Sequence, residues 1–182
     1  MILGIDVSST CTGFAITRSG GQLVYNESCI LKKGNIYEKA QKLREHILKI
    51  SKEYFIESVY IEEALLNFKF GRTSAHTLSM LHKFNGIVSY MRYEIFDVQP
   101  VHINASSARK LAGVKKTKQV QHQHSKQVSS TKIDVFEHLV ISEPSFEFLT
   151  TKTGNVKSEA YDRADAIIVA KAGALQCQQQ KK

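Results

Sequence analysis

The sequence predicts one α/β domain with a mixed five-stranded sheet, in which three antiparallel strands come first, parallel strands follow, and helices flank the sheet. Two observations predict this architecture. Residues 1–31 contain three short apolar segments separated by turn residues, which is typical of an antiparallel meander. From residue 37 onward, helical periodicity alternates with two further short apolar runs, and this alternation favours helices packed on the faces of a sheet.

The meander is expected to consist of MILGIDV at 1–7, FAIT at 14–17 and QLVYNESCIL at 22–31, with the SGG at 19–21 as a turn. A helix over 37–53 is expected next. Its apolar residues fall on one helical face: Ala40, Leu43, Ile47 and Ile50.

The middle of the chain is expected to supply the parallel strands. SVYIEEA at 58–64 should pair with the first strand, and FDVQPVHI at 96–103 should form the fifth. A long helix is expected between them, over 73–93, with these apolar residues at helical spacing: Met80, Leu81, Phe84, Ile87, Val88 and Met91. It carries more large apolar groups than one sheet contact needs, which indicates a two-fold symmetric homodimer.

Three helices are expected in the C-terminal half. A short one over 104–113 begins with cap-type residues and ends at glycine. The next is marked by Ile133, Phe136, Leu139 and Val140. The last, over 158–175, carries Ala160, Ala164, Ile167, Ile168 and Leu175 on its apolar face.

The segments between and after these helices are expected to be irregular. Residues 114–131 are polar, without periodicity, and are expected to form a mobile loop, and 142–157 are expected to be irregular. The predicted domain therefore covers 1–175, and a disordered tail covers 176–182.

Positive charge is concentrated in one part of the chain. The net charge is +8, and no Asp or Glu occurs from Val98 to Ile133. That stretch contains Arg109, Lys110, Lys115, Lys116, Lys118, Lys126 and Lys132. A confined positive field suits a polyanion such as nucleic acid. The alternative is a solvated, flexible loop.

Composition indicates a cytoplasmic globular protein. Hydrophobic residues make up 42% of the chain, and the apolar runs are far shorter than the ~20 residues of a membrane span. No signal-peptide pattern precedes the first strand. Cys11, Cys29 and Cys177 are widely spaced without a CxxC pair, so we expect reduced thiols and no structural zinc.

Four carboxylates lie at the ends of apolar segments: Asp6, Glu62, Asp162 and Asp165. If the first and fourth strands are parallel neighbours, Asp6 and Glu62 reach the same sheet edge. Asp162 and Asp165 share one helical face because they are three residues apart, although a lone DxxD can also be exposed helix charge. A carboxylate cluster is costly unless cations neutralise it, and Mg²⁺ or Mn²⁺ takes such oxygen ligands. The pattern favours two-metal phosphoryl chemistry.

Three segments resemble the motifs of RuvC-type Holliday junction resolvases: ILGIDVSSTCTGFAI, VYIEEA and DRADAIIVA, in the same order, spanning Ile2 to Ala170. The resemblance implies an RNase H-like fold and a homodimer that nicks Holliday junctions or other branched DNA with Mg²⁺, leaving 5′-phosphate and 3′-hydroxyl ends. It also implies that the four carboxylates are catalytic ligands of two Mg²⁺ ions, with Mn²⁺ as a substitute.

The chain departs from this family at several positions. Val7 replaces the usual proline, Leu65 stands where bacterial members place an aromatic, and Glu63 stands where they carry a neutral amide. The resemblance therefore does not support Glu63 as a ligand. These departures are consistent with a divergent, phage-encoded member, which would act in the host cytoplasm.

Two groups of residues are candidate DNA contacts. In LLNFKFGR, Phe68 or Phe70 could stack on unpaired bases while Lys69 and Arg72 hold phosphates, although one phenylalanine can instead belong to the core. Backbone phosphates are the expected partners of Arg109, Lys110, Lys115, Lys116, Lys118 and Lys132. His122 and His124 have no acidic or cysteine partner nearby in the sequence, so a DNA-facing loop is expected there, not a metal site.

Other functions are compatible with parts of the sequence pattern. A non-catalytic DNA-binding module on the same fold and a YqgF-like RNA-processing nuclease both remain open, although YIEE fits the second poorly. The N-terminal hairpin also resembles the phosphate-binding hairpin of sugar kinases and actin-like ATPases. Those proteins need a second lobe and a later glycine-rich motif, which this chain lacks.

Overall fold

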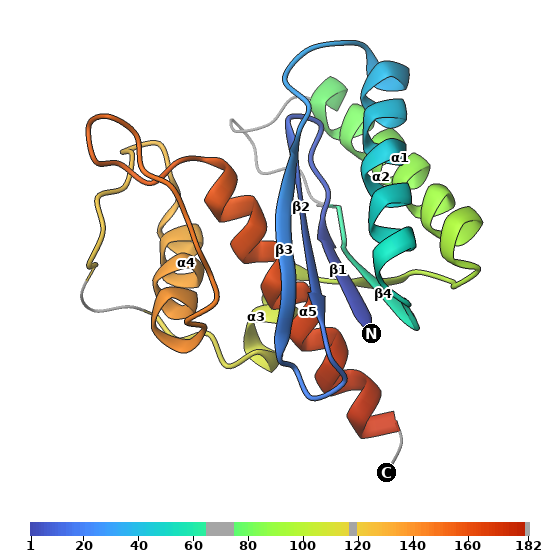
Figure 1. The fold of residues 1–182 in the computed structure, drawn as a ribbon. Helices are drawn as coiled ribbons and strands as arrows, with labels where there is room; N and C mark the ends of the chain where they lie inside the picture. The colour runs from blue at the N-terminus through green and yellow to red at the C-terminus, as the bar shows by residue number, and fades with distance from the viewer. Residues whose placement is uncertain (65–74, 117–119, 181–182) are drawn as a thin grey trace.

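A computed structural model describes residues 1–64, 75–116 and 120–180. Five strands form one sheet in the order β3-β2-β1-β4-β5 (Figure 1). β1 (Ile2–Asp6) pairs antiparallel with β2 (Cys11–Thr17), which pairs antiparallel with β3 (Leu23–Ile30). On its other side β1 pairs parallel with β4 (Ser58–Glu62), and β4 pairs parallel with β5 (Val101–Ile103). The predicted mixed sheet is confirmed.

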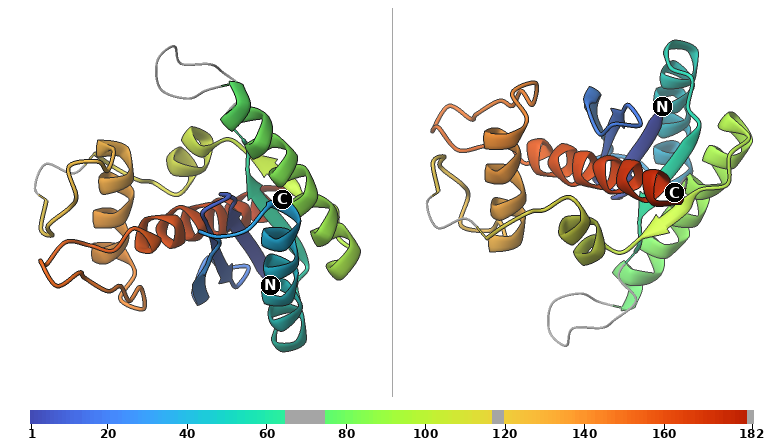
Figure 2. Two further views of the ribbon diagram at one scale, coloured as in Figure 1. Left: turned by 90° about the horizontal axis from the view of Figure 1, so that it is seen from above. Right: turned by 90° about the horizontal axis from the view of Figure 1, so that it is seen from below.

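One face of the sheet is covered by α1 (Ile36–Glu53) and α2 (Ala75–Phe96), as Figure 2 shows. Asn35 begins α1 with a capping box, in which its side chain accepts from the backbone while Glu38 accepts from the Asn35 N–H. Alternate strand residues such as Leu3 and Ile5 point into this layer and pack with α1 and α2.

The other face is covered by α5 (Glu159–Gln180), and α3 (Ala105–Leu111) and α4 (Ser130–Ser142) pack against α5. Ile2 and Tyr60 point to this side and pack with α5, whose buried surface is rich in alanine. α5 lies directly on the strands because Gly4 and Gly13 lack side chains. A Cβ at Gly4 would lie 2.3 Å from the Ala170 nitrogen, and one at Gly13 would lie 2.0 Å from the Asp162 carbonyl oxygen.

Several element boundaries differ from the prediction. β2 begins at Cys11 instead of at residue 14. The fifth strand covers 101–103 instead of 96–103, because α2 continues to Phe96 and is followed by Asp97, whose φ of 52° breaks the helix. α5 continues to Gln180, so residues 176–180 are helical and the expected disordered tail is wrong for them. The half-buried Cys177 lies 3.4 Å from the Tyr60 hydroxyl, which ties this last part of α5 to the sheet.

Cys11, Cys29 and Cys177 are free thiols, as the spacing predicted. Among the described residues, no helix is both long enough and apolar enough to cross a membrane.

Candidate active site

The four carboxylates singled out in the sequence meet in one cavity of about 220 Å³. Asp6 and Glu62 end neighbouring parallel strands, and the preceding residues Ile5 and Ile61 are register partners. Because side chains alternate along a strand, Asp6 points to the same face as Ile2, and Glu62 to the same face as Tyr60. That face is the one that α5 covers.

The register of the sheet also determines the positions of the two α5 aspartates, Asp162 and Asp165. Gly13 is the β2 partner of Asp6, and the Asp162 carbonyl lies against the bare backbone of Gly13. Asp162 is therefore held beside the end of β1, and Asp165 follows on the same helical face. Asp6 is 9% exposed and Asp165 is 4% exposed, so the site removes most of their hydration.

Two cations partly neutralise the cluster. The Lys132 Nζ, from α4, lies 3.0 Å from Asp162 Oδ1 and 3.4 Å from Asp165 Oδ2. The Arg109 Nη2, from α3, donates to Asp165 Oδ1 at 3.2 Å. Both basic residues were expected to contact DNA, and in this structure they face the carboxylates. Four carboxylates against two cations leave the site short of positive charge.

The pKa values of the site reflect this shortage. Burial and then the charge of Glu62 raise the pKa of Asp6 well above its usual range, and Lys132 only partly opposes them. Burial and then Asp165 raise the pKa of Glu62 to about 7, against the influence of Arg109 and Lys132. Burial alone would lower the pKa of Lys132, but the surrounding aspartates outweigh it and raise that pKa. Any added cation therefore stabilises the ionised site.

The donor atoms fit a hard divalent cation, since all four candidate ligands are carboxylates. Within residues 1–64, 75–116 and 120–180, however, no three His, Cys, Asp or Glu side chains are grouped so that they could hold a metal ion. Lys132 and Arg109 lie where such an ion would compete for the same oxygens. The predicted metal site thus has suitable chemistry, and metal binding stays a prediction.

Two further residues support the site. Asn85, buried in α2, donates from Nδ2 to the Glu62 carbonyl at 3.2 Å and so ties the end of β4 to the opposite layer. Ser8 lines the cavity, and its hydroxyl and backbone bond Thr10 and Thr12, so it shapes the turn after Asp6. The sequence did not indicate the role of Asn85, because this residue lies on a helical face that was predicted to be apolar.

The histidine pair belongs to a hydrogen-bonded network with a buried carboxylate that is distant in the sequence. His122 and His124 do have an acidic partner, because Glu137 of α4 is fully buried and accepts from both rings. Its Oε1 lies 3.0 Å from His122 Nδ1 and 2.9 Å from His124 Nε2. His124 Nδ1 also lies 2.6 Å from the Tyr161 hydroxyl. Glu137 lies four residues after Ile133 on the predicted apolar face, and the sequence alone did not indicate its histidine partners.

The other predicted DNA contacts are distributed as follows. Lys110, Lys115 and Lys116 are exposed near the end of α3 and after it, and they are not among the residues that line the cavity. The remaining candidates lie outside the described residues: Phe68, Lys69, Phe70, Arg72 and Lys118. Glu63 lines the cavity, and its backbone N–H bonds the Ile103 carbonyl at 2.9 Å.

Comparison with known proteins shows the fold. No protein-family model matches the sequence, and no curated protein matches it either. Several solved structures, however, match the chain. Thermus thermophilus RuvC in complex with a Holliday junction substrate matches with a TM-score of 0.64 at 15% identity, covering 98% of this chain and 94% of that one.

The chain has the RuvC fold. A second structure of Thermus thermophilus RuvC has a TM-score of 0.60 at 17% identity, over 98% of this chain and 96% of that one. The yeast mitochondrial Holliday junction resolvase Ydc2 has a TM-score of 0.55 at 12% identity, over 99% of this chain and 80% of that one. The RNase H-like architecture predicted from the motifs is therefore confirmed, and the likeness covers nearly the whole chain.

Proposed function

We propose that this protein is a RuvC-type resolvase, a Mg²⁺-dependent endonuclease that nicks Holliday junctions or other branched DNA. The observation that carries the proposal is the meeting of Asp6, Glu62, Asp162 and Asp165 in one cavity at the strand ends of the RuvC fold. A buried carboxylate cluster with too little positive charge has few uses in a structural protein, because it costs stability.

In the proposed reaction, these four side chains would hold two Mg²⁺ ions, with Mn²⁺ as a substitute. When bound, the ions would supply an activated water and stabilise the leaving oxygen of a phosphodiester, giving 5′-phosphate and 3′-hydroxyl ends. Asp6 and Glu62 are held rigidly by the sheet, and Asp162 and Asp165 by α5, so the protein keeps the ligands in place before substrate arrives.

Lys132 and Arg109 have a second role in this proposal. In the metal-free protein they stabilise the aspartates. The Lys132 side chain is 37% exposed, so it can turn to a backbone phosphate of the substrate once metal neutralises its partners. Lys110, Lys115 and Lys116 would hold further phosphates of the branched DNA.

We also propose a homodimer, because a four-way junction offers two symmetric strands to cut. α2 leaves two large aromatic side chains in solvent, Tyr90 at 67% and Tyr93 at 53% exposure. Light scattering coupled to gel filtration tests this assembly. A mass near twice 20.5 kDa is expected, and a monomer at micromolar concentration would contradict it.

Two alternatives are separated by one cleavage experiment. A non-catalytic DNA-binding module is favoured by the cations among the carboxylates, and a YqgF-like RNA-processing nuclease shares the fold class. The assay offers Mg²⁺ and labelled four-way junction, fork, flap, linear duplex and structured RNA. We expect nicks in the junction that DNA ligase can reseal, and little cutting of linear duplex. Binding without cutting would favour the first alternative, and preferred cutting of RNA the second.

A further inference from the structure

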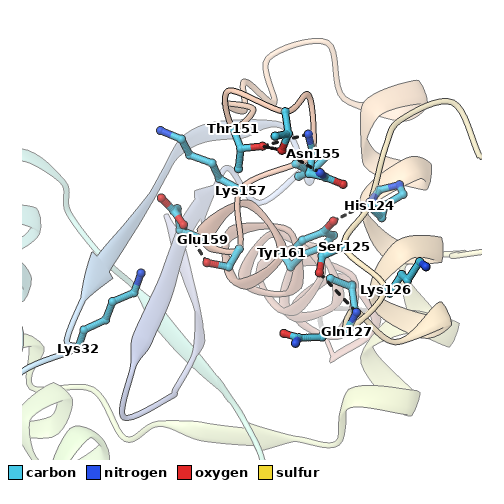
Figure 3. A pocket seen from close by; sticks show the side chains of 14 residues that line it. Lys32, His124, Ser125, Lys126, Gln127, Thr151, Asn155, Lys157, Glu159 and Tyr161 are labelled. Carbon is cyan, nitrogen blue, oxygen red and sulfur yellow. Dashed lines mark hydrogen bonds between the residues drawn. The ribbon is translucent and has the colours of Figure 1, made fainter.

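A second and larger hollow lies beside the carboxylate cavity, with a volume of about 1040 Å³ (Figure 3). Three segments that are distant in the sequence form its walls: Lys32, just after β3; residues 124–128, ahead of α4; and residues 151–161, which lead into α5. In Figure 3, Lys32 and Lys157 lie on one side and Lys126 on the other. We call this hollow the basic groove.

The basic groove carries an excess of positive charge. Lys32, Lys126 and Lys157 line it, and Glu159 is the one carboxylate among its lining residues. Within the part of the chain that the structure describes, none of these lysines has an ion-pair partner within 4.0 Å. Lys32 and Lys157 are near enough to Glu159 to help lower its pKa, but three lysines against one carboxylate still leave net positive charge for an external anion.

The neutral groups of the basic groove suit the same kind of ligand. Hydroxyl and amide side chains from two walls line it: Ser125, Gln127, Thr151, Thr153, Asn155 and Ser158. Short hydroxyl and amide donors of this type, together with lysines, are the usual partners of phosphate oxygens in protein–DNA contacts.

The walls are held in place by the fold. The His124 ring bridges Glu137 and Tyr161, which fixes the wall ahead of α4. The Val156 N–H donates to the Gln123 carbonyl at 2.9 Å, which joins that wall to the segment before α5. Residues 120–128 were expected to belong to a mobile loop, and the structure instead holds His122, His124 and Val128 of this segment against α4 and α5.

The basic groove and the carboxylate cavity are neighbours. Glu159 lines the groove and Asp162 lines the cavity, and they lie one turn apart on α5, a rise of about 5 Å. Val128 likewise lines the groove, whereas Lys132, in the first turn of α4, reaches the aspartates. A DNA strand whose phosphate lies at the carboxylates would reach the groove within about one or two nucleotides, since one strand rises about 3.4 Å per nucleotide.

We propose that the basic groove binds the backbone phosphates of the DNA strand adjacent to the cut position. Lys32, Lys126 and Lys157 are the cations that hold them. This inference rests on the proposed function in placing the cut phosphate at the carboxylates. It adds a contact surface formed by segments on the β3 side of α5, separate from the lysines near α3.

The test compares two triple variants in an Asp6→Asn background with EDTA, so that binding is measured without cutting. One variant is Lys32→Gln/Lys126→Gln/Lys157→Gln. The matched control is Lys42→Gln/Lys49→Gln/Lys52→Gln, which removes the same charge from exposed positions on α1, on the opposite face of the sheet. Anisotropy of a labelled four-way junction gives the affinity at several salt concentrations.

The groove variant should reduce the slope of log affinity against log salt by about 2 to 3, since each phosphate contact contributes about 0.9. The control should change that slope by less than about 1. Equal slopes for the two variants would overturn the inference, even if the unmodified protein nicks junctions. A reduced slope for the groove variant supports the inference. If the slope is reduced but the unmodified protein does not cut DNA, only the proposed nuclease activity is wrong.

Discussion

The side chains of the carboxylate cavity combine opposite tendencies. Burial and mutual repulsion raise the pKa values of Asp6 and Glu62. The positive charge of Lys132 opposes this rise at both carboxylates, and that of Arg109 opposes it at Glu62. A protein that needed only stability would replace such a group with apolar side chains, because buried charges rarely repay their desolvation. The arrangement fits the proposed divalent cations, which would supply the charge that the two basic side chains do not.

In metal-free buffer, Glu62→Gln should stabilise the protein by about 1–3 kcal/mol at pH 8. Burial and Asp165 raise the pKa of Glu62 in the folded state to about 7, from its ordinary 4.5 in the unfolded chain. Its contribution to stability is therefore complete below pH 4.5 and is lost as the pH rises through 7. The amide does not titrate and escapes this loss.

Denaturant unfolding in EDTA from pH 5 to pH 8 measures this effect. The difference in the free energy of unfolding between Glu62→Gln and the unmodified protein should widen with pH. A difference that stays constant across that range would show that Glu62 ionises normally.

Single residues show clearly what the sequence could and could not predict. Asp6, Glu62, Asp162 and Asp165 were predictable because each closes or opens an apolar segment whose place in an α/β fold is constrained. Asn85 and Glu137 were not predictable, because the role of a polar residue within an apolar helical face depends on its partner in the folded structure. That partner is the Glu62 carbonyl for Asn85 and the histidine pair for Glu137.

Among the secondary-structure elements, α5 matters most to the site. It lies so close to β1 and β2 that two glycines replace side chains at the contact. Gly13→Ala should displace Asp162, because the new Cβ would lie 2.0 Å from its carbonyl oxygen. We expect a loss of about 1–3 kcal/mol in stability and a fall in nicking of at least about tenfold.

Gly86→Ala is the matched control, because nothing lies within 4 Å of a Cβ there and the residue is inside α2. It should gain up to about 1 kcal/mol in stability and leave nicking unchanged. Thermal unfolding and junction nicking, measured on both variants, check this. Equal activity of Gly13→Ala and Gly86→Ala would mean that the closeness of α5 does not position Asp162.

The segment before α4 depends on one buried carboxylate. Glu137→Gln removes the charge that both His122 and His124 contact, so we expect a loss of about 1–3 kcal/mol and release of residues 120–128. Limited trypsin digestion should then cut faster after Lys126. Glu147→Gln, at an exposed position outside this network, is the control. Equal cutting of both variants would contradict the role of Glu137.

The boundaries of the elements were harder to predict than their existence. Periodicity predicted α1 well, since Ala40, Leu43, Ile47 and Ile50 are its buried residues. The fifth strand was predicted too long, because a few apolar residues can continue α2 as readily as they can begin a strand. The end of α5 was predicted too early, because its glutamines are polar although they are good helix formers.

The whole molecule divides its functions between the two sides of the sheet. α1 and α2 form an ordinary core layer, whereas α3, α4 and α5 bring the basic residues to the carboxylates (Figure 2). The sequence predicted the parallel pairing of β1 and β4 and hence the cavity. It did not predict the basic groove, because Lys32, Lys126 and Lys157 come from segments without regular structure and meet through tertiary packing alone.

The most direct test of the central claim is Mg²⁺-dependent nicking of a synthetic four-way junction by the unmodified protein, Asp6→Asn and Glu45→Gln. Glu45 is an exposed carboxylate on α1 and serves as the control. We predict that the unmodified protein and Glu45→Gln nick the junction in Mg²⁺ and not in EDTA. Asp6→Asn should bind it with similar affinity and lose at least about 100-fold in rate. Full nicking by Asp6→Asn would contradict the claim that the four carboxylates form the active site.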